Sequence, residues 1–182
     1  MAVSDYCGKY YYCHEEKECK EVCLKFLRDE LLYDIGNCAY VEADVMGDNA
    51  EHARHVVADV CEEGNRERVL RVLGEAHAHI TELLYPYTKS EVSEGERDDR
   101  ATSPDAYVVE MSVPSEMSGT TINHLSHQIH EYMVCRALSD WLCFAGLKSA
   151  ELWAGKAAAA EAEIKRVKHL RRSVFTRPLR PW

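Results

Sequence analysis

The sequence predicts a mainly helical fold: a bundle of about five helices with a small β-hairpin or single-strand element and an extended C-terminal tail. Apolar residues recur at helical spacing over most of the chain, one short segment alternates with a period of two, and the end is basic and broken by proline. At 182 residues with 46% apolar content, the chain can bury one sizeable core. We therefore expect a single helical domain over residues 1–170 and a basic tail over residues 171–182.

The first helix is expected over residues 14–34, where apolar side chains recur at helical spacing. Gly36 and Asn37 follow it and are typical of a helix end. Residues 40–46 are then expected to connect it to a short second helix, with residues 47–49 as the cap. The apolar residues of this short helix are Ala53, Val56, Val57 and Val60.

The third helix, expected over residues 66–84, is the most regular amphipathic stretch of the chain. Gly64 and Asn65 separate it from the short helix, and Pro86 forces the chain to leave it. Residues 89–105 are rich in Ser, Glu, Asp and Arg, so we expect an exposed loop there. The apolar stripe of the third helix consists of Val69, Leu73, Ala76, Ile80, Leu83 and Leu84.

A β element is expected over residues 106–113, because apolar and polar side chains alternate there up to Pro114. A strand needs a partner for its backbone hydrogen bonds, and the sequence leaves two candidates open. Residues 85–92 could pair with it across the polar loop as a long hairpin, or the partner strand could come from another subunit. The inward row is Tyr107, Val109, Met111 and Val113.

Two long helices follow the β element. The fourth helix is expected over residues 121–145 with Gly146 as its stop, and its apolar content predicts that it is central in the bundle. The last helix is expected over residues 149–172, and its run of alanines at 157–160 allows close approach to a neighbouring helix. The large aromatic residues expected in the core are Tyr107, Trp141 and Trp153.

Charge is strongly segregated along the chain. The net charge is −9, yet residues 165–182 contain seven Lys or Arg and no acid, which leaves about −16 on residues 1–164. Part of this basic charge complements the dipole of the last helix. An acidic body disfavours nucleic-acid binding, so DNA contact is expected, if at all, through the tail. No membrane-spanning stretch and no secretory signal are visible, so we expect synthesis in the cytoplasm and no membrane partner.

The tail is expected to be the main interaction segment. It is basic and broken by proline, so it cannot bury a core of its own, and another copy of this chain offers the nearest acidic surface. Arginine and aromatic anchors are typical of interface hot spots. The expected interface residues are Arg171, Arg172, Arg177, Arg180 and Trp182.

Cysteines near the start raise the question of a zinc site. The densest set of soft ligands is Cys7, Cys13, His14, Cys19 and Cys23. Their spacing does not match the close pairs of a zinc ribbon, so we expect partly buried thiols instead. The remaining cysteines lie singly in apolar or helical surroundings, and most of them are expected to be reduced core residues. These are Cys38, Cys61, Cys135 and Cys143.

Histidines on the fourth helix are the other metal candidates. His124, His127 and His130 recur every three residues, with Glu131 beside the last. A carboxylate-bridged di-iron bundle needs Glu-x-x-His on two helices, and this chain has none. We therefore expect exposed or interfacial imidazoles and no cofactor. Weaker sets of the same kind are His52 with His55 and Asp59, and His77 with His79.

No nucleophile elbow, phosphate-binding loop or dinucleotide-binding turn is present. Residues 129–142, the Ala-rich last helix with Trp153, and the tail from Arg171 to Trp182 instead resemble small structural proteins of tailed phages and prophages. The similarity covers about the second half of the chain and is greatest to head-to-tail connectors, or neck adaptors. It implies a helical protomer that assembles as a ring in the virion, with portal and tail components as partners and no catalytic residues. The cysteines and the histidine-rich helix depart from this pattern.

Three functional hypotheses follow. The first, which we favour, is a non-enzymatic virion assembly protein whose tail arginines pair with acids of a neighbouring copy. The second is a metal-dependent helical-bundle enzyme that uses His124, His127, His130 and Glu131. The third is an accessory protein that contacts DNA through its tail.

Overall fold

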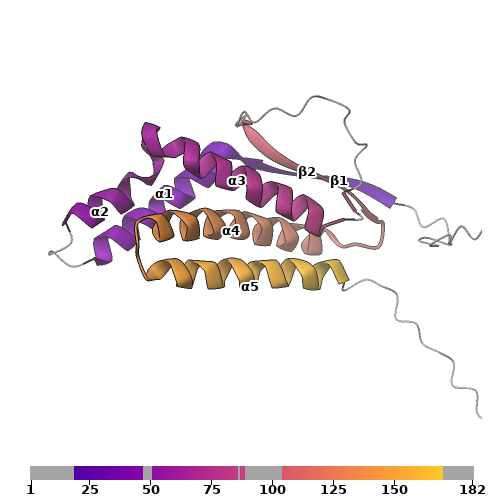
Figure 1. Cartoon of the computed structure of the whole chain (residues 1–182). Helices are drawn as coiled ribbons and strands as arrows, with labels where there is room; N and C mark the ends of the chain where they lie inside the picture. The colour runs from indigo at the N-terminus through magenta and orange to yellow at the C-terminus, as the bar shows by residue number, and fades with distance from the viewer. Residues whose placement is uncertain (1–18, 47–50, 86, 89–103, 170–182) are drawn as a thin grey trace, which may run out of the picture.

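The computed structural model describes residues 19–46, 51–85, 87–88 and 104–169. Within these ranges the chain is mainly helical, with five α-helices and a two-stranded antiparallel sheet, as the sequence predicts (Figure 1). A short 3-10 helix, Asp59–Cys61, joins the second α-helix to the third. The elements are β1 (Cys19–Leu27), α1 (Arg28–Val45), α2 (Glu51–Ala58), α3 (Glu63–Leu83), β2 (Ala106–Pro114), α4 (Gly119–Phe144) and α5 (Ser149–His169).

The strand over residues 106–113 finds its partner far away in the same chain. β2 pairs with β1 in an antiparallel register that runs from Cys19 opposite Pro114 to Leu27 opposite Ala106. The Arg28 backbone N–H donates to the Asp105 carbonyl at 3.0 Å and extends this ladder by one step. The partner is therefore neither residues 85–92 nor a strand of another subunit. The inward row of β2 is buried, as the alternation predicts.

The expected helix over residues 14–34 is wrong at both ends. Residues 19–27 form β1, because Val22, Leu24 and Phe26 also fit a period of two and β2 needs a partner for its backbone groups. The helix that follows begins at Arg28, continues through Gly36 and ends at Val45, so residues 40–46 are not a connection except for Met46. A side chain at Gly36 would place its Cβ 3.2 Å from the Cys61 sulfur, so glycine permits close packing here.

The other helices lie close to their expected positions. α3 begins at Glu63, a few residues before the expected start, with Glu62 as its N-cap. Gly146 has a φ of +72° directly after α4, a conformation that favours glycine, and it ends that helix as predicted. Several predicted features lie outside the described residues. These are the cap at 47–49, residues 14–18 of the first helix, the loop over 89–103, residues 170–172 of the last helix, and the tail over 171–182.

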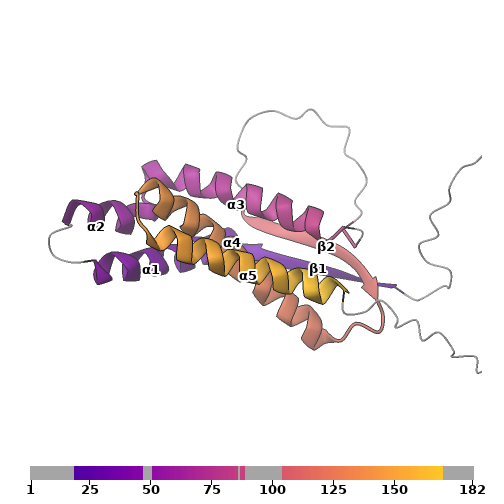
Figure 2. The same cartoon turned by 60° about the horizontal axis from the view of Figure 1, so that its bottom comes forward.

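The core is built around α4, which lies between α5 and a layer formed by α1, α3 and the sheet (Figure 1). Figure 2 shows β2 lying between α3 and β1, so β1 is on the side of the sheet away from α3. Both helical tryptophans are buried, as predicted. The Trp141 indole donates to the Val57 carbonyl at 3.2 Å, and the Trp153 indole donates to the Glu42 carboxylate at 3.0 Å. None of the helices in the described part of the chain is long and apolar enough to cross a membrane.

A substitution in this core tests the packing. Leu73 of α3 is fully buried, so Leu73→Ala removes apolar contacts and leaves a cavity. We expect it to lower the free energy of unfolding by about 2–5 kcal/mol, measured by urea denaturation followed by circular dichroism. Leu152→Ala is the matched control, since that side chain is 60% exposed and its loss should change stability by less than about 0.5 kcal/mol. Equal losses for the two variants would contradict this packing.

Candidate protein-docking surface

The histidines of α4 point to different partners instead of to one another. His124 Nε2 lies 3.0 Å from a Glu163 carboxylate oxygen, and His130 Nε2 lies 2.7 Å from Asp34. His127 is exposed. Among the described residues, no group of three or more His, Cys, Asp or Glu side chains could hold a metal ion. The histidine contacts therefore join α4 to α5 and to α1.

The histidines of α3 make contacts of the same kind. His77 Nε2 lies 2.8 Å from the Val108 carbonyl, which can only accept, so this nitrogen donates. His79 Nε2 lies 3.6 Å from a Glu161 oxygen of α5. Each imidazole thus links α3 to a neighbouring element.

The six described cysteines have different surroundings. Cys19 and Cys23 are exposed on β1, while Cys7, Cys13 and His14 lie outside the described residues, so the predicted ligand set is described only in part. Cys135 is buried, and Cys143 is exposed instead of belonging to the core. Cys38 and Cys61 are partly buried, and the Cys61 thiol donates to the Leu32 carbonyl at 3.2 Å.

Burial keeps the inner thiols protonated. Desolvation, followed by the nearby Glu131 carboxylate, raises the pKa of Cys135 to about 12. Desolvation also raises the pKa of Cys38 and of Cys61. A nucleophilic cysteine needs a lowered pKa, so none of these three has the environment of a catalytic thiol.

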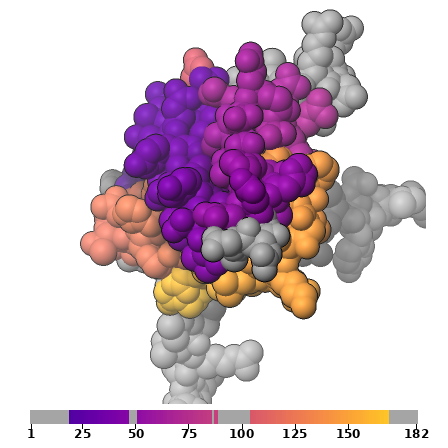
Figure 3. All heavy atoms as spheres, turned by 90° about the vertical axis from the view of Figure 1, so that its left-hand side faces the viewer, coloured from indigo at the N-terminus to yellow at the C-terminus, as the bar shows by residue number. Residues whose placement is uncertain are grey.

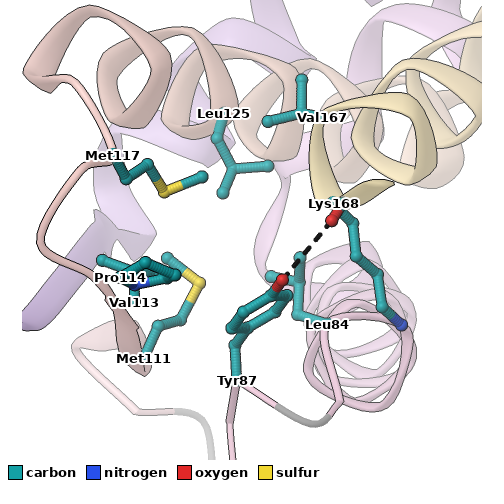
Figure 4. A pocket seen from close by; sticks show the side chains of 9 residues that line it. All are labelled: Leu84, Tyr87, Met111, Val113, Pro114, Met117, Leu125, Val167 and Lys168. Carbon is teal, nitrogen blue, oxygen red and sulfur yellow. Dashed lines mark hydrogen bonds between the residues drawn. The ribbon is translucent and has the colours of Figure 1, made fainter. Parts of the chain in front are cut away.

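An enclosed cavity near the end of β2 is small and apolar. It measures about 20 Å³, roughly the space of one water molecule, whereas small-molecule pockets usually measure about 300–1,000 Å³ (Figure 4). The Tyr87 hydroxyl donates to the Lys168 carbonyl at 3.5 Å along one wall. This cavity is a packing gap too small for a substrate. Its lining residues are Leu84, Tyr87, Met111, Val113, Pro114, Met117, Leu125, Val167 and Lys168.

A wider, open hollow of about 470 Å³ lies between the start of α1 and α4. Its wall is acidic and aromatic, and only His130 comes from α4. The remaining wall comes from the first two turns of α1, namely Asp29, Glu30, Tyr33 and Asp34. The composition of this hollow suits a positively charged partner that also carries apolar side chains.

The exposed face of α1 continues from this hollow to the end of the helix. Four of the nine exposed large hydrophobic side chains in the described ranges lie on α1, including Tyr33 at 73%, Tyr40 at 64% and Val45 at 81% exposed. Tyr33 and Tyr40 are seven residues apart, which places them on one side of the helix. We call this surface the α1 face, defined by Asp29, Glu30, Tyr33, Asp34, Tyr40, Val41, Asp44 and Val45.

The α1 face was not found by sequence reasoning. The expected helix ends before Gly36, and the expected connection covers residues 40–46. Tyr33 and Tyr40 therefore belong to different expected elements and do not form one helix face. The signal was the seven-residue spacing of the two tyrosines, which becomes informative only once the helix runs through Gly36.

The predicted interface residues Arg171, Arg172, Arg177, Arg180 and Trp182 lie outside the described residues. The last basic residues before them are occupied within the chain. Lys165 pairs with Glu161 and Arg166 with Glu163, while the Lys168 ammonium donates to the Leu83 carbonyl. Hydrogen bonds from Arg166 and then His124 lower the pKa of Glu163 to about 2. In the described part of the basic segment 165–182, Lys165, Arg166 and Lys168 therefore already have contacts within the chain.

In comparisons with known proteins, no family model, no curated protein and no solved structure matches this chain. The resemblance of residues 129–142, Trp153 and the tail to phage connectors stays a prediction. The assignment of a function therefore depends on the α1 face and on the chemistry of the tail.

Thiol alkylation tests the contrast between buried and exposed cysteines. With a pKa of about 12, about one Cys135 side chain in ten thousand is a thiolate at pH 8, and the residue is also buried. We expect iodoacetamide to modify Cys143 of the native protein readily and to leave Cys135 unmodified, as measured by peptide mass spectrometry. Both should react alike in denaturant. Native Cys135 that reacts as fast as Cys143 would show that this part of the core is open.

Proposed function

We propose that this protein is a non-enzymatic structural subunit that assembles with copies of itself, as a head-to-tail connector or neck ring of a tailed phage. The observation that carries the proposal is the α1 face, an exposed helix surface that combines acids with Tyr33, Tyr40 and Val45. Proteins rarely leave apolar side chains clustered on one surface unless that surface binds a partner.

The chemistry of the tail complements this face. Residues 170–182 contain four arginines, Phe175 and Trp182, and no acid. Arginine pairs with carboxylates through two parallel hydrogen bonds, and its flat guanidinium also stacks on tyrosine rings. Three acids of the α1 face already have partners within the chain: Asp29 contacts Arg28 and Arg66, Asp34 contacts His130, and Asp44 contacts Arg54. The tail arginines of another copy would share or replace these contacts, or pair with Glu30, while the aromatic side chains of the tail pack against Tyr33 and Tyr40.

The end of α5 lies far from the α1 face, which favours contact between copies. α1 and α2 lie at one end of the molecule, and α5 ends at the other (Figures 1 and 2). Figure 3 looks onto the first of these ends, with α1 in indigo. A donor at one end and an acceptor at the other make a heterologous interface, which repeats head to tail and closes into a ring when the rotation permits.

A ring-forming subunit is consistent with the resemblance of residues 129–142, Trp153 and the tail to head-to-tail connectors. On this proposal its partners are further copies of the chain and the portal and tail components, and it works in the virion. The tail is also the segment through which any DNA contact would occur, because the body is acidic.

Removal of the tail tests the proposal directly. We expect the full chain at high concentration to form species larger than a dimer in native mass spectrometry, and a variant that lacks residues 173–182 to form dimers at most. The helical content of the two proteins should agree, since the deleted residues follow α5. Unchanged large species after the deletion would exclude the tail as the assembling segment.

Charge reversal on the acceptor side gives a second test. Glu30→Lys with Asp44→Lys places two positive charges on the α1 face and should abolish the same large species by repelling the tail arginines. Glu67→Lys with Glu75→Lys is the matched control, because both side chains are exposed on α3 and the net charge changes equally. If the control weakened assembly as much as the α1 variant, the effect would reflect net charge and not this surface.

A further inference from the structure

The outer edge of β1 differs from the outer edge of β2. The Arg28 to Asp105 hydrogen bond and the register show that even-numbered residues of β1 bond to β2, so Glu21, Cys23 and Lys25 direct their backbone groups away from the sheet. On the other side, the outer edge of β2 is occupied: Ser112 donates to the Tyr87 carbonyl and His77 bonds to Val108. Within the described residues the sheet has two strands and no third strand lies along β1.

The side chains along this edge are exposed, and opposite charges stand at equal distances on the two sides of Cys23. Glu21, Cys23 and Lys25 all point to the exposed face of the sheet. Glu21 and Lys25 stand two residues before and two residues after Cys23, and they carry opposite charges. When a second copy of this strand runs antiparallel to the first, the charges of the two strands are therefore complementary.

We propose that β1 pairs with β1 of a second copy in an antiparallel, two-fold arrangement centred on Cys23, which joins the two sheets into one of four strands. In this register Glu21 of each copy lies opposite Lys25 of the other, and the two Cys23 side chains face each other. On the inner face, half-buried Val22 lies opposite Leu24 of the second copy, so an apolar pair accompanies the charged pairs.

The charges also favour this register over its neighbours. A slip of two residues centres the pair on Val22 or on Leu24, so Cys23 faces Glu21 or Lys25 and both pairs of opposite charges are lost. A slip of four residues centres the pair on Glu21 or on Lys25, and in either case a like charge faces itself. A slip of one residue exchanges the two faces of the strand, so it places apolar Val22 and Leu24 against the exposed face. The arrangement centred on Cys23 is therefore the one in which charge and burial both agree.

This contact goes beyond the proposed function and does not depend on it. A two-fold interface uses the same surface on both copies and closes after two, whereas the contact between the tail and the α1 face can repeat. The two interfaces use different residues, so each can be removed without the other.

Disulfide crosslinking of the full-length protein tests the register. Residues opposite each other in a hydrogen-bonded antiparallel pair have Cα atoms about 5.5 Å apart, within disulfide range, whereas the two Cys19 residues would be about 26 Å apart. Mild oxidation should give a covalent dimer that Cys23→Ser abolishes and Cys19→Ser leaves unchanged, with the Cys23 linkage identified by peptide mass spectrometry. A dimer that survives Cys23→Ser would overturn the proposal.

A charge swap provides the second readout. Glu21→Lys places like charges opposite each other twice in the pair, because the substituted side chain faces Lys25 of the other copy, and it should lower the yield of the Cys23 crosslink by about tenfold. Adding Lys25→Glu restores opposite charges, and the yield should return to within about twofold of the original. If Glu21 and Lys25 serve only to prevent aggregation through the edge of β1, Glu21→Lys will leave the yield of the Cys23 crosslink unchanged, and the proposal fails.

The deletion of residues 173–182 separates this proposal from the proposed function. The Cys23 crosslink should form equally well without the tail, since β1 and the tail take part in different interfaces. Loss of the crosslink on deletion would show that the tail, and not the β1 edge, brings the two copies together. Loss of the large species with a retained crosslink would support both interfaces.

Discussion

The antiparallel ladder between β1 and β2 joins two segments that are separated by three helices in the sequence. The ladder satisfies the backbone groups on the inner edges of both strands and presents one apolar row to α4. Because α1 begins directly after Leu27, the direction of β1 also sets where α1 starts. Pairing β1 with β2 closes the intervening chain, residues 28–105, into a loop. The entropic cost of loop closure grows only slowly with loop length, so burial of the strand pair and of α1 can offset it. The position of α1, and with it the α1 face, depends on this ladder.

Several histidines and cysteines, which often serve as catalytic or metal-binding residues, instead make contacts between helices and strands in this protein. His124 and His130 join α4 to α5 and α1, while His77 contacts the outer edge of β2. Cys61 packs where Gly36 leaves room for it, and Cys135 has a raised pKa within the core. A chain rich in histidine and cysteine can thus use them as short connectors between elements, with no convergence on a common ligand among the described residues.

The surfaces of the molecule have two different symmetries. The β1 edge complements itself, and a contact of that kind closes after two copies. The α1 face complements the tail, and a contact between two different surfaces can continue from copy to copy. Together they would let one small subunit form a limited pair first and a larger assembly afterwards. In the proposed assembly, repulsion between the acidic bodies would be offset where the basic tail of one copy meets the acids of another.

The sequence by itself determined α3, β2, α4 and α5, because their apolar residues follow a single period over long stretches and are punctuated by Pro114 and Gly146. Burial of Trp141 and Trp153 followed from the same pattern. The tertiary structure decided β1, since Val22, Cys23, Phe26 and Leu27 recur at helical spacing while Val22, Leu24 and Phe26 alternate as in a strand. The need of β2 for a partner selects the strand. It also decided that α1 runs through Gly36, where packing against Cys61 outweighs a helix propensity cost of about 1 kcal/mol. The α1 face and the β1 edge follow from these two outcomes, which depend on contacts between distant residues that no local pattern records.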